Sequence, residues 1–313
     1  MQNKIIFILG PTATGKSAVV VHLARKLNAE IISADSMQIY RGMNLLTSKP
    51  PSSWRKKIKH HLFDFIPLDK VYDANQYCKD ALSKVDLIIK KGKVPLFTGG
   101  TGLYATMLLD GIFSIKKPDI SIRKRLYGLA DRYGKNYLCN RLKRVDAEAA
   151  RKIHPNDLRR VIRALEVFEA CGKPISELQK KRTGIREKFD VKIFCLNIKR
   201  DELYNRINQR VDRMFKQGVV NEVKALNKRR ISRTALAAIG IKEIKGFLNG
   251  EYSLEEAKSL MKRNTRRYAK RQLTWFRKDK TIKWINLTGK EIPAQVANKI
   301  WKKINGKGFI SHS

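Results

Sequence analysis

The feature that most limits what this chain can fold into is its opening, where an apolar run leads directly into a glycine-bracketed loop. Residues 5–9 are apolar, and the loop reads Gly10-Pro11-Thr12-Ala13-Thr14-Gly15-Lys16-Ser17 ahead of a helical pattern. This spacing is typical of a phosphate-binding loop, in which backbone N–H groups and the positive end of a helix surround an anion. Lys16 adds a full charge, and Ser17 offers a hydroxyl to Mg²⁺. The sequence therefore predicts a di- or triphosphate site on a strand-loop-helix unit.

Strand and helix patterns alternate through most of the chain. Strands are expected at residues 4–9, 29–33, 94–98, 191–198 and 281–287, and helices at 16–27, 74–91, 202–217, 219–226, 253–278 and 293–304. This order predicts an α/β fold, a P-loop NTPase-like parallel sheet core flanked by helices, with ligands at the carboxyl ends of the strands. Residues 36–73 are expected to be irregular and functional, because loops of that length are uncommon otherwise.

Charged helical segments interrupt the α/β pattern between about residues 116 and 184. Helices are expected at 122–133 and 157–171, with boundaries at Lys116-Lys117-Pro118 and Arg182-Thr183-Gly184. We expect residues 116–184 to form an all-helical insertion domain. Residues 1–115 and 185–313 would then form the core, with basic helices toward the C-terminus.

Positive charge is the second informative property. The chain holds 67 Lys and Arg against 28 Asp and Glu, a formal net charge of +39. Residues 1–112 carry 16 basic and 8 acidic side chains, whereas residues 113–313 carry 51 and 20. Because the excess lies mostly outside the phosphate loop, it indicates a second, extended polyanion such as a nucleic acid.

The remaining composition points to a cytoplasmic protein. The four cysteines have no short-spaced pair, and no signal peptide precedes the first strand. No apolar run approaches the roughly 20 residues that would span a bilayer. We therefore expect reduced thiols, a cytoplasmic location and no membrane partner.

Asp35 follows the second predicted strand, where its carboxylate would face the phosphate loop. Three roles stay open for it: a general base, a magnesium ligand, or a cap of the local turn. The next strand along the chain ends in Thr98-Gly99-Gly100-Thr101-Gly102, a second glycine-rich loop without the Asp that an ATPase usually places there. Thr101 either approaches the reacting centre or caps the helix that follows.

Two basic patterns also have two interpretations each. Arg206, Arg210 and Arg213 share one helix face, which either meets a diphosphate or is simply solvated. Residues 262–280 hold nine basic side chains and one acid, with Tyr268, Trp275 and Phe276 between them. This mixture suits RNA, whose unstacked bases can pack on aromatic rings, but it also suits aromatic core packing behind a basic face.

Taken together and in order, these and several further segments resemble the tRNA dimethylallyltransferase family of bacterial tRNA isopentenyltransferases. The segments that carry the resemblance are the phosphate loop, Asp35-Ser36-Met37-Gln38-Ile39-Tyr40-Arg41-Gly42-Met43, Lys49-Pro50, His60-His61-Leu62, Thr98-Gly99-Gly100-Thr101-Gly102-Leu103-Tyr104, Arg163-Ala164-Leu165-Glu166-Val167 and Ala269-Lys270-Arg271-Gln272. The resemblance covers nearly the whole chain. It departs from the usual family pattern at Met37, at Leu45-Leu46-Thr47-Ser48 in place of Ile-Gly-Thr-Ala, and at Ile241 in place of Tyr.

The resemblance implies transfer of a dimethylallyl group from dimethylallyl diphosphate to N6 of adenosine 37 in the tRNA anticodon loop, with release of diphosphate and help from Mg²⁺ held by Ser17. It implies catalytic roles for Asp35, Thr101 and Arg210. The diphosphate would bind Thr12, Ala13, Thr14, Gly15, Lys16 and Ser17, and the tRNA would contact Asp35, Ser36, Met37, Gln38, Arg123, Arg159, Arg160 and Arg163. We expect a monomer, because tRNA alone could cover the basic surface.

Other functions remain to be weighed at this stage. Adenylate isopentenyltransferases share the phosphate loop, but free nucleotide would not need a net charge of +31 over residues 113–313. A phosphoryl-transferring P-loop kinase or NTPase is the main alternative, which ATP hydrolysis or phosphate transfer stimulated by RNA would favour. A non-catalytic RNA-binding protein would bind RNA equally well without Lys16 and Asp35.

Overall fold

The computed structural model describes residues 3–113 and 120–306, and it divides into two compact units. Residues 1–108 and 188–313 form the first, which we call the core unit, and residues 109–187 form the second, the helical unit. The expected boundary at residues 115 and 116 lies outside the described residues. Within the described residues, no helix is both long and apolar enough to cross a membrane.

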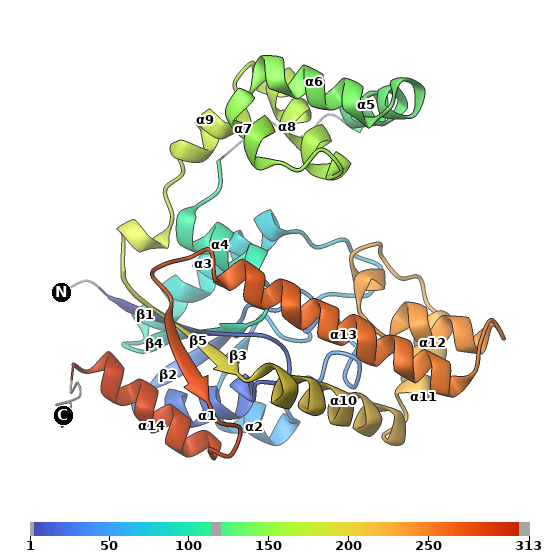
Figure 1. Ribbon diagram of the computed structural model, residues 1–313. Coiled ribbons are helices and arrows are strands. Elements are labelled where there is room, and N and C mark those ends of the chain that lie inside the picture. Colours follow the sequence, from blue (N-terminus) through green and yellow to red (C-terminus); the bar gives the residue numbers. More distant parts are fainter. Residues whose placement is uncertain (1–2, 114–119, 307–313) are drawn as a thin grey trace. The chain divides into compact units, whose positions relative to one another are not determined.

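The core unit is built on a six-stranded, all-parallel sheet with the order β3-β2-β4-β1-β5-β6 (Figure 1). The strands are β1 (Lys4–Leu9), β2 (Ala29–Ser33), β3 (His60–His61), β4 (Val94–Gly99), β5 (Asp190–Ile198) and β6 (Lys283–Leu287). The expected P-loop-like parallel sheet is thus confirmed. Its order places the carboxyl ends of β2, β4 and β1 side by side.

Helices flank this sheet, and α1 and α3 contact its strands directly. The helices of the core unit are α1 (Lys16–Leu27), α2 (Ser52–Lys57), α3 (Ala74–Lys90), α4 (Gly102–Asp110), α10 (Arg200–Lys216), α11 (Val219–Asn227), α12 (Ile241–Leu248), α13 (Leu254–Phe276) and α14 (Pro293–Ile304). Ile6 and Ile8 pack with side chains of α1 and α14, whereas Phe7 stacks on Phe97 at 4.4 Å between ring centroids. Both faces of β1 are therefore buried, which explains its unbroken apolar sequence.

The sequence located the long elements of the core unit and missed the short ones. The predicted bounds of β1, β2, α1 and α14 coincide with the observed ones. The segment expected to be irregular contains α2 and β3, because six residues rich in Ser, Arg and Lys and a two-residue strand carry no hydrophobic period. The eight-residue helix α12 was also not predicted.

The helical unit contains α5 (Ile120–Tyr133), α6 (Lys135–Val145), α7 (Ala147–Lys152), α8 (Leu158–Cys171) and α9 (Ile175–Lys180). They surround a separate apolar core centred on Leu126, Leu138 and Leu165. Asp146 is buried between two elements, where its carboxylate accepts hydrogen bonds from the backbone N–H groups of Ala149 and Ser176. The all-helical insertion that the sequence predicts is present, with Gly172 as the C-cap that ends α8 and Pro174 as the N-cap before α9.

Candidate functional site

A cavity of about 1080 Å³ opens at the carboxyl ends of β1, β2 and β4 within the core unit. Its wall comes from the phosphate loop, the segment after β2, the glycine loop after β4, and one face each of α10 and α13. Segments far apart in sequence therefore meet here, as expected for a parallel sheet.

Five successive backbone N–H groups of the phosphate loop are free to bind an anion. No described residue accepts a hydrogen bond from the N–H groups of residues 13–17. Ala13 and Gly15 adopt positive φ angles of 66° and 83°, which bends the loop so that α1 begins at Lys16. Unpaired donors at a helix N-terminus form a ready-made site for phosphate oxygens.

Thr12 behaves differently from the rest of the loop. Its N–H donates to Oε1 of Gln272 at 3.0 Å, and Nε2 of Gln272 donates to the carbonyl of Gly100 at 2.9 Å. Gln272 is buried on α13 and joins the two glycine-rich loops. Thr12 lines the cavity, but its N–H is already occupied, so the available donors begin at Ala13.

Lys16 points back into its own loop. Its ammonium donates to the carbonyl of Pro11 at 2.6 Å. Burial lowers the pKa of Lys16 to about 8, the negative charge of Asp35 opposes this shift, and Arg210 adds to it. A desolvated cation with a single carbonyl partner gains strongly from an incoming anion.

Asp35 lies on the cavity wall directly after β2. Its Oδ1 accepts hydrogen bonds from the N–H groups of Met37 at 2.9 Å and Gln38 at 3.3 Å. None of the described residues hydrogen-bonds to the other oxygen, Oδ2. One oxygen therefore caps the local turn, and the second is available for chemistry or for a metal.

Thr101 contacts the neighbour of Asp35 and does not line the cavity. Its hydroxyl accepts from the N–H of Ser36 at 2.9 Å and donates to the Ser36 hydroxyl at 3.2 Å. Ser36, in turn, is part of the cavity wall. In this structure Thr101 fixes the turn that carries Asp35, and direct contact with the reacting groups stays a prediction.

The arginines of α10 face the same cavity. Arg206, Arg210 and Arg213 all contribute to its wall, so they are not a purely solvated stripe. Arg206 is engaged by Glu202 at 2.7 Å and by the carbonyl of Gly289. Arg210 forms no hydrogen bond or ion pair with the described residues, and burial lowers its pKa to about 10. A partly buried guanidinium that lines a cavity and has no such partner is suited to an anionic ligand.

The donors present fit a magnesium ion that is held mainly by its substrate. Ser17 and Asp35 offer oxygens to the same cavity as the free amides. Among the described residues, no cluster of three or more His, Cys, Asp or Glu side chains could hold a metal alone. Mg²⁺ commonly uses one or two protein oxygens together with phosphate oxygens and water, which is what this wall offers.

Helix α13 separates its aromatic from its basic side chains. Phe276 is buried, and Trp275 donates from Nε1 to the Thr106 hydroxyl at 3.0 Å. The Tyr268 hydroxyl lies beside Thr101 and Gln272, and burial together with the charge of Asp35 raises its pKa. Phe276 and Trp275 thus pack inward, as the core-packing interpretation expects, whereas Tyr268 is part of the cavity wall, so base stacking stays open for its ring. The exposed basic residues of α13 are Arg263, Arg267, Lys270 and Arg271.

The arginines that the resemblance assigns to tRNA lie in the helical unit, mostly on α8. Glu166 is buried at 1% exposure and pairs with Arg123 at 2.7 Å and Arg163 at 3.2 Å. Arg160 pairs with Asp157 at 3.2 Å, and Arg159 is exposed. Two of the four guanidinium groups are therefore held by one buried carboxylate. Their contact with tRNA stays a prediction.

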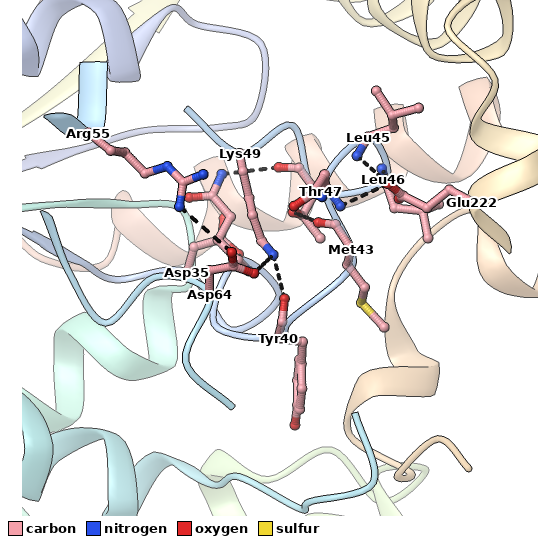
Figure 2. Close-up of polar contacts among 12 residues, drawn as sticks. Asp35, Tyr40, Met43, Leu45, Leu46, Thr47, Lys49, Arg55, Asp64 and Glu222 are labelled. Atoms are coloured by element: carbon pink, nitrogen blue, oxygen red, sulfur yellow. Dashed lines mark hydrogen bonds and ion pairs between the residues drawn. The ribbon is translucent and has the colours of Figure 1, made fainter. Parts of the chain in front are cut away.

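The sequence did not single out several residues that shape the cavity. Gln272 was read only as part of a motif, and nothing near Glu222 suggested that its carboxylate would accept three backbone N–H groups from residues 44–46. Neither residue carries a local pattern that reveals a partner more than 170 positions away. In the segment around residues 44–50, the Lys49-Pro50 pair is the one motif that the sequence analysis used. Figure 2 shows the Lys49 ammonium between the Tyr40 carbonyl and Asp64.

Comparisons with known proteins show which family this chain belongs to. A family model described as IPP transferase matches residues 38–279. A tRNA dimethylallyltransferase of Halothermothrix orenii is 45% identical over 290 residues, covering 92% of this chain and 88% of its own, and one of Thermotoga maritima is 44% identical over 303 residues, covering 96% and 98%.

Solved structures are similar over the whole chain. The full-length tRNA isopentenylpyrophosphate transferase of Bacillus halodurans has a TM-score of 0.70 at 35% identity, with 100% of both chains covered. A eukaryotic dimethylallyltransferase, described as acting on tRNA, has a TM-score of 0.83 at 28% identity, covering 99% of this chain and 81% of its own. On the family match and these identities, this chain belongs to the IPP transferase family.

Proposed function

We propose that this chain transfers a dimethylallyl group from dimethylallyl diphosphate to N6 of adenosine 37 in the anticodon loop of tRNA. The observation that carries the proposal is the meeting of an anion cradle and a carboxylate in one cavity, formed by residues 13–17, Lys16, Arg210 and Asp35. The names of the relatives, tRNA dimethylallyltransferases, supply the two substrates.

The chemistry makes different demands on the two sides of the cavity. As the allylic C–O bond breaks, its electron pair leaves with the diphosphate, and negative charge grows on the bridging oxygen. The free amides of residues 13–17, Lys16 and Arg210 stabilise this charge more in the transition state than in the bound substrate. That difference accelerates the departure of the leaving group.

The nucleophile needs a base. When N6 of adenine bonds to the allylic carbon, the nitrogen must lose a proton, and Oδ2 of Asp35 can accept it. Asp35 keeps its place because Oδ1 is held by the N–H of Met37 and because Ser36 is held by Thr101. The carboxylate is therefore oriented before either substrate arrives.

The proposal includes Mg²⁺ bound through the Ser17 hydroxyl and diphosphate oxygens. When bound, the ion would neutralise charge on the leaving group. Its binding can be followed apart from turnover, because Ser17→Ala should weaken Mg²⁺-dependent binding of inorganic diphosphate while leaving Mg²⁺-independent binding unchanged. Equal binding by Ser17→Ala and wild type in both conditions would remove Ser17 from the metal site.

RNA binding is the third part of the proposal. The exposed cations of α13 border the cavity through Arg271, and the helical unit offers its own arginines on α8. The target base would reach Asp35 only when turned out of its loop, which costs less in a loop than in a duplex. Ser36, Met37 and Gln38 lie next to Asp35 on the wall where such a base would enter.

The decisive experiment is direct. The protein is incubated with dimethylallyl diphosphate, Mg²⁺ and an anticodon stem-loop containing the target adenosine, and the RNA is weighed by mass spectrometry. A gain of one dimethylallyl unit, absent when the target adenosine is replaced by guanosine, supports the proposal. An unchanged RNA mass, or phosphate transfer from ATP in the same assay, refutes it.

A further inference from the structure

The segment that forms the wall beside Asp35 is fastened to a distant helix by one carboxylate. Glu222 on α11 accepts hydrogen bonds from three successive backbone N–H groups: Oε2 from Asn44 at 2.9 Å and Leu45 at 2.8 Å, and Oε1 from Leu46 at 2.9 Å. Figure 2 shows the Glu222 carboxylate against the backbone of Leu45 and Leu46. A carboxylate that receives several backbone donors forms strong, charge-assisted hydrogen bonds.

We call residues 44–48 the wall segment, since all five line the cavity. Two hydrogen bonds close it on itself, from the N–H of Ser48 to the Leu45 carbonyl at 3.0 Å and from the N–H of Lys49 to the Asn44 carbonyl at 3.1 Å. The Thr47 hydroxyl donates to the Met43 carbonyl at 2.5 Å. The segment is thus a compact turn whose first three N–H groups have no partner inside it.

The packing of Leu46 agrees with this arrangement. Leu46 is 6% exposed, and a Cβ added to Gly240 would lie 2.5 Å from Leu46 Cδ2 and 3.0 Å from Cε of Met261. Leu46 does not adopt a positive φ, so a leucine fits this position without backbone strain. The side chain and the backbone of the wall segment are therefore both held from the α11–α13 side.

A chain of hydrogen bonds joins the wall segment to the catalytic carboxylate. Nε2 of Gln38 donates to the carbonyls of Thr47 at 3.1 Å and Ser48 at 3.4 Å. The N–H of Gln38 donates to Oδ1 of Asp35 at 3.3 Å. Any movement of the wall segment would shift the Gln38 amide and, through it, the turn that orients Asp35.

We propose that Glu222 is a positioning residue, which holds the wall segment so that the incoming RNA base is placed against Asp35. The proposal rests on the proposed function, because it assigns this side of the cavity to the RNA. The diphosphate side stands apart from it, since the phosphate loop and Arg210 lie on β1, α1 and α10 and share no hydrogen bond with the wall segment among the described residues.

The test is the isosteric variant Glu222→Gln. Its amide nitrogen cannot accept a hydrogen bond, so at least one of the three backbone donors loses its partner. We expect kcat/KM for the stem-loop RNA to fall about 10- to 100-fold, the cost of a displacement near 1 Å at a reacting group. The KM for dimethylallyl diphosphate should stay unchanged, and amide hydrogen exchange at residues 44–46 should become faster.

The matched control is Glu255→Gln on α13. Glu255 is also a core-unit helix glutamate, but its side chain is 79% exposed, and its one ion pair among the described residues is with Lys258 at 3.5 Å. This variant should match wild type in both substrate constants and in exchange.

Three results would overturn the assignment. They are unchanged kcat/KM for RNA in Glu222→Gln, a rise in the KM for dimethylallyl diphosphate, and a fall in melting temperature with faster exchange across the sheet, which would mark a general structural role. If the wild type transfers no dimethylallyl group, the proposed function fails on its own. Stem-loop affinity and exchange at residues 44–46 then still decide whether Glu222 organises an RNA-binding wall.

Discussion

The two oxygens of Asp35 have separate environments, and this division explains how one carboxylate can both hold its turn and carry a base. Oδ1 accepts hydrogen bonds from the N–H groups of Met37 and Gln38, whereas Oδ2 receives no hydrogen bond from the described residues. The sequence left three roles open for Asp35. The structure shows the turn cap directly, and it leaves an oxygen for the base or the metal role.

A substitution that removes the proton-accepting oxygen of Asp35 but keeps the turn separates the general-base role from the turn-capping role. Asp35→Asn keeps an oxygen that can accept from Met37 but cannot take a proton. We expect turnover to fall about 10²- to 10⁴-fold, the range typical of a lost general base, with nearly unchanged RNA affinity by fluorescence anisotropy. Asp86→Asn, an exposed carboxylate on α3, should behave as wild type. A large loss of RNA affinity with normal turnover would identify Asp35 as a contact only.

Lys16 leads to a prediction about pH. Its pKa in the free protein is about 8, below the ordinary value of 10.5, so the buried ammonium costs stability below pH 8, and this cost is relieved as pH rises from about 8 toward 10.5. Bound diphosphate favours the ammonium and raises this pKa, so binding above pH 8 requires uptake of a proton. We expect diphosphate affinity to fall above pH 8, by up to about tenfold per pH unit.

Calorimetry between pH 6.5 and 9.5 in buffers of different ionisation enthalpy measures both the affinity and the proton uptake. The variant Lys16→Gln should bind weakly at every pH and should show no uptake of a proton by the side chain. Wild-type affinity that is level from pH 7 to 9.5, with no proton uptake, would contradict the prediction.

At the scale of secondary-structure elements, the arginines of α10 differ in whether neighbouring groups leave them available to a ligand. Three guanidinium groups share one face, but Arg206 is engaged by Glu202 and the Gly289 carbonyl, and Arg210 stays without a partner among the described residues. Periodicity in the sequence could place the three on one face. It could not tell that a loop near residue 289 would engage one of them.

The corresponding prediction compares two arginines of α10. Arg210→Gln should lower kcat/KM for dimethylallyl diphosphate about 10- to 100-fold, as expected when a hydrogen-bonded charge worth about 1.5–3 kcal/mol is lost. The Kd for the stem-loop RNA should stay near the wild-type value by fluorescence anisotropy. Arg200→Gln, an exposed change at the start of the same helix, should have no effect. Equal losses in the two variants would mean that Arg210 has no special role.

Helix α13 shows where a mixed pattern is resolved only by packing. Its sequence interleaves cations with aromatic rings, and both an RNA surface and a core face were consistent with it. Phe276 is buried and the Trp275 indole contacts Thr106, so these two rings pack in the core, whereas Tyr268 lines the cavity and Arg267 and Lys270 are exposed. The period of 3.6 residues fixed which side chains share a face, but the neighbouring elements determined which face is inside.

At the scale of the whole molecule, the candidate ligand groups fall into two units. The diphosphate cradle lies in the core unit, and the arginines assigned to tRNA on α8 lie in the helical unit. The two kinds of binding should therefore respond independently to substitution.

This independence is testable with Arg159, which is exposed at the start of α8. Arg159→Gln should weaken stem-loop binding and reduce the dependence of log affinity on log salt concentration by roughly 0.7, the value for one phosphate contact on single-stranded RNA. Binding of inorganic diphosphate should stay unchanged. Lys299→Gln on α14 serves as the control for a lost surface charge. An unchanged salt dependence in Arg159→Gln would remove α8 from the proposed RNA surface.

The sequence by itself determined the parts whose information is local. Three such features could be recognised without knowing any distant contact. They are the apolar runs of β1 and β2, the spacing of the phosphate loop and the periodicity of the long helices. The helical character of the insertion followed from the same local patterns. Each of these features depends on backbone geometry and solvent exposure along a short segment.

Only the tertiary structure decided how the cavity is assembled. In the folded chain, the N–H of Thr12 donates to Gln272, and the backbone N–H groups of residues 44–46 donate to Glu222. The Thr101 hydroxyl accepts from the N–H of Ser36. The physical reason is that hydrogen bonds satisfy whichever donors and acceptors the fold brings within reach, and a donor and an acceptor that lie 65 to 260 positions apart share no local pattern.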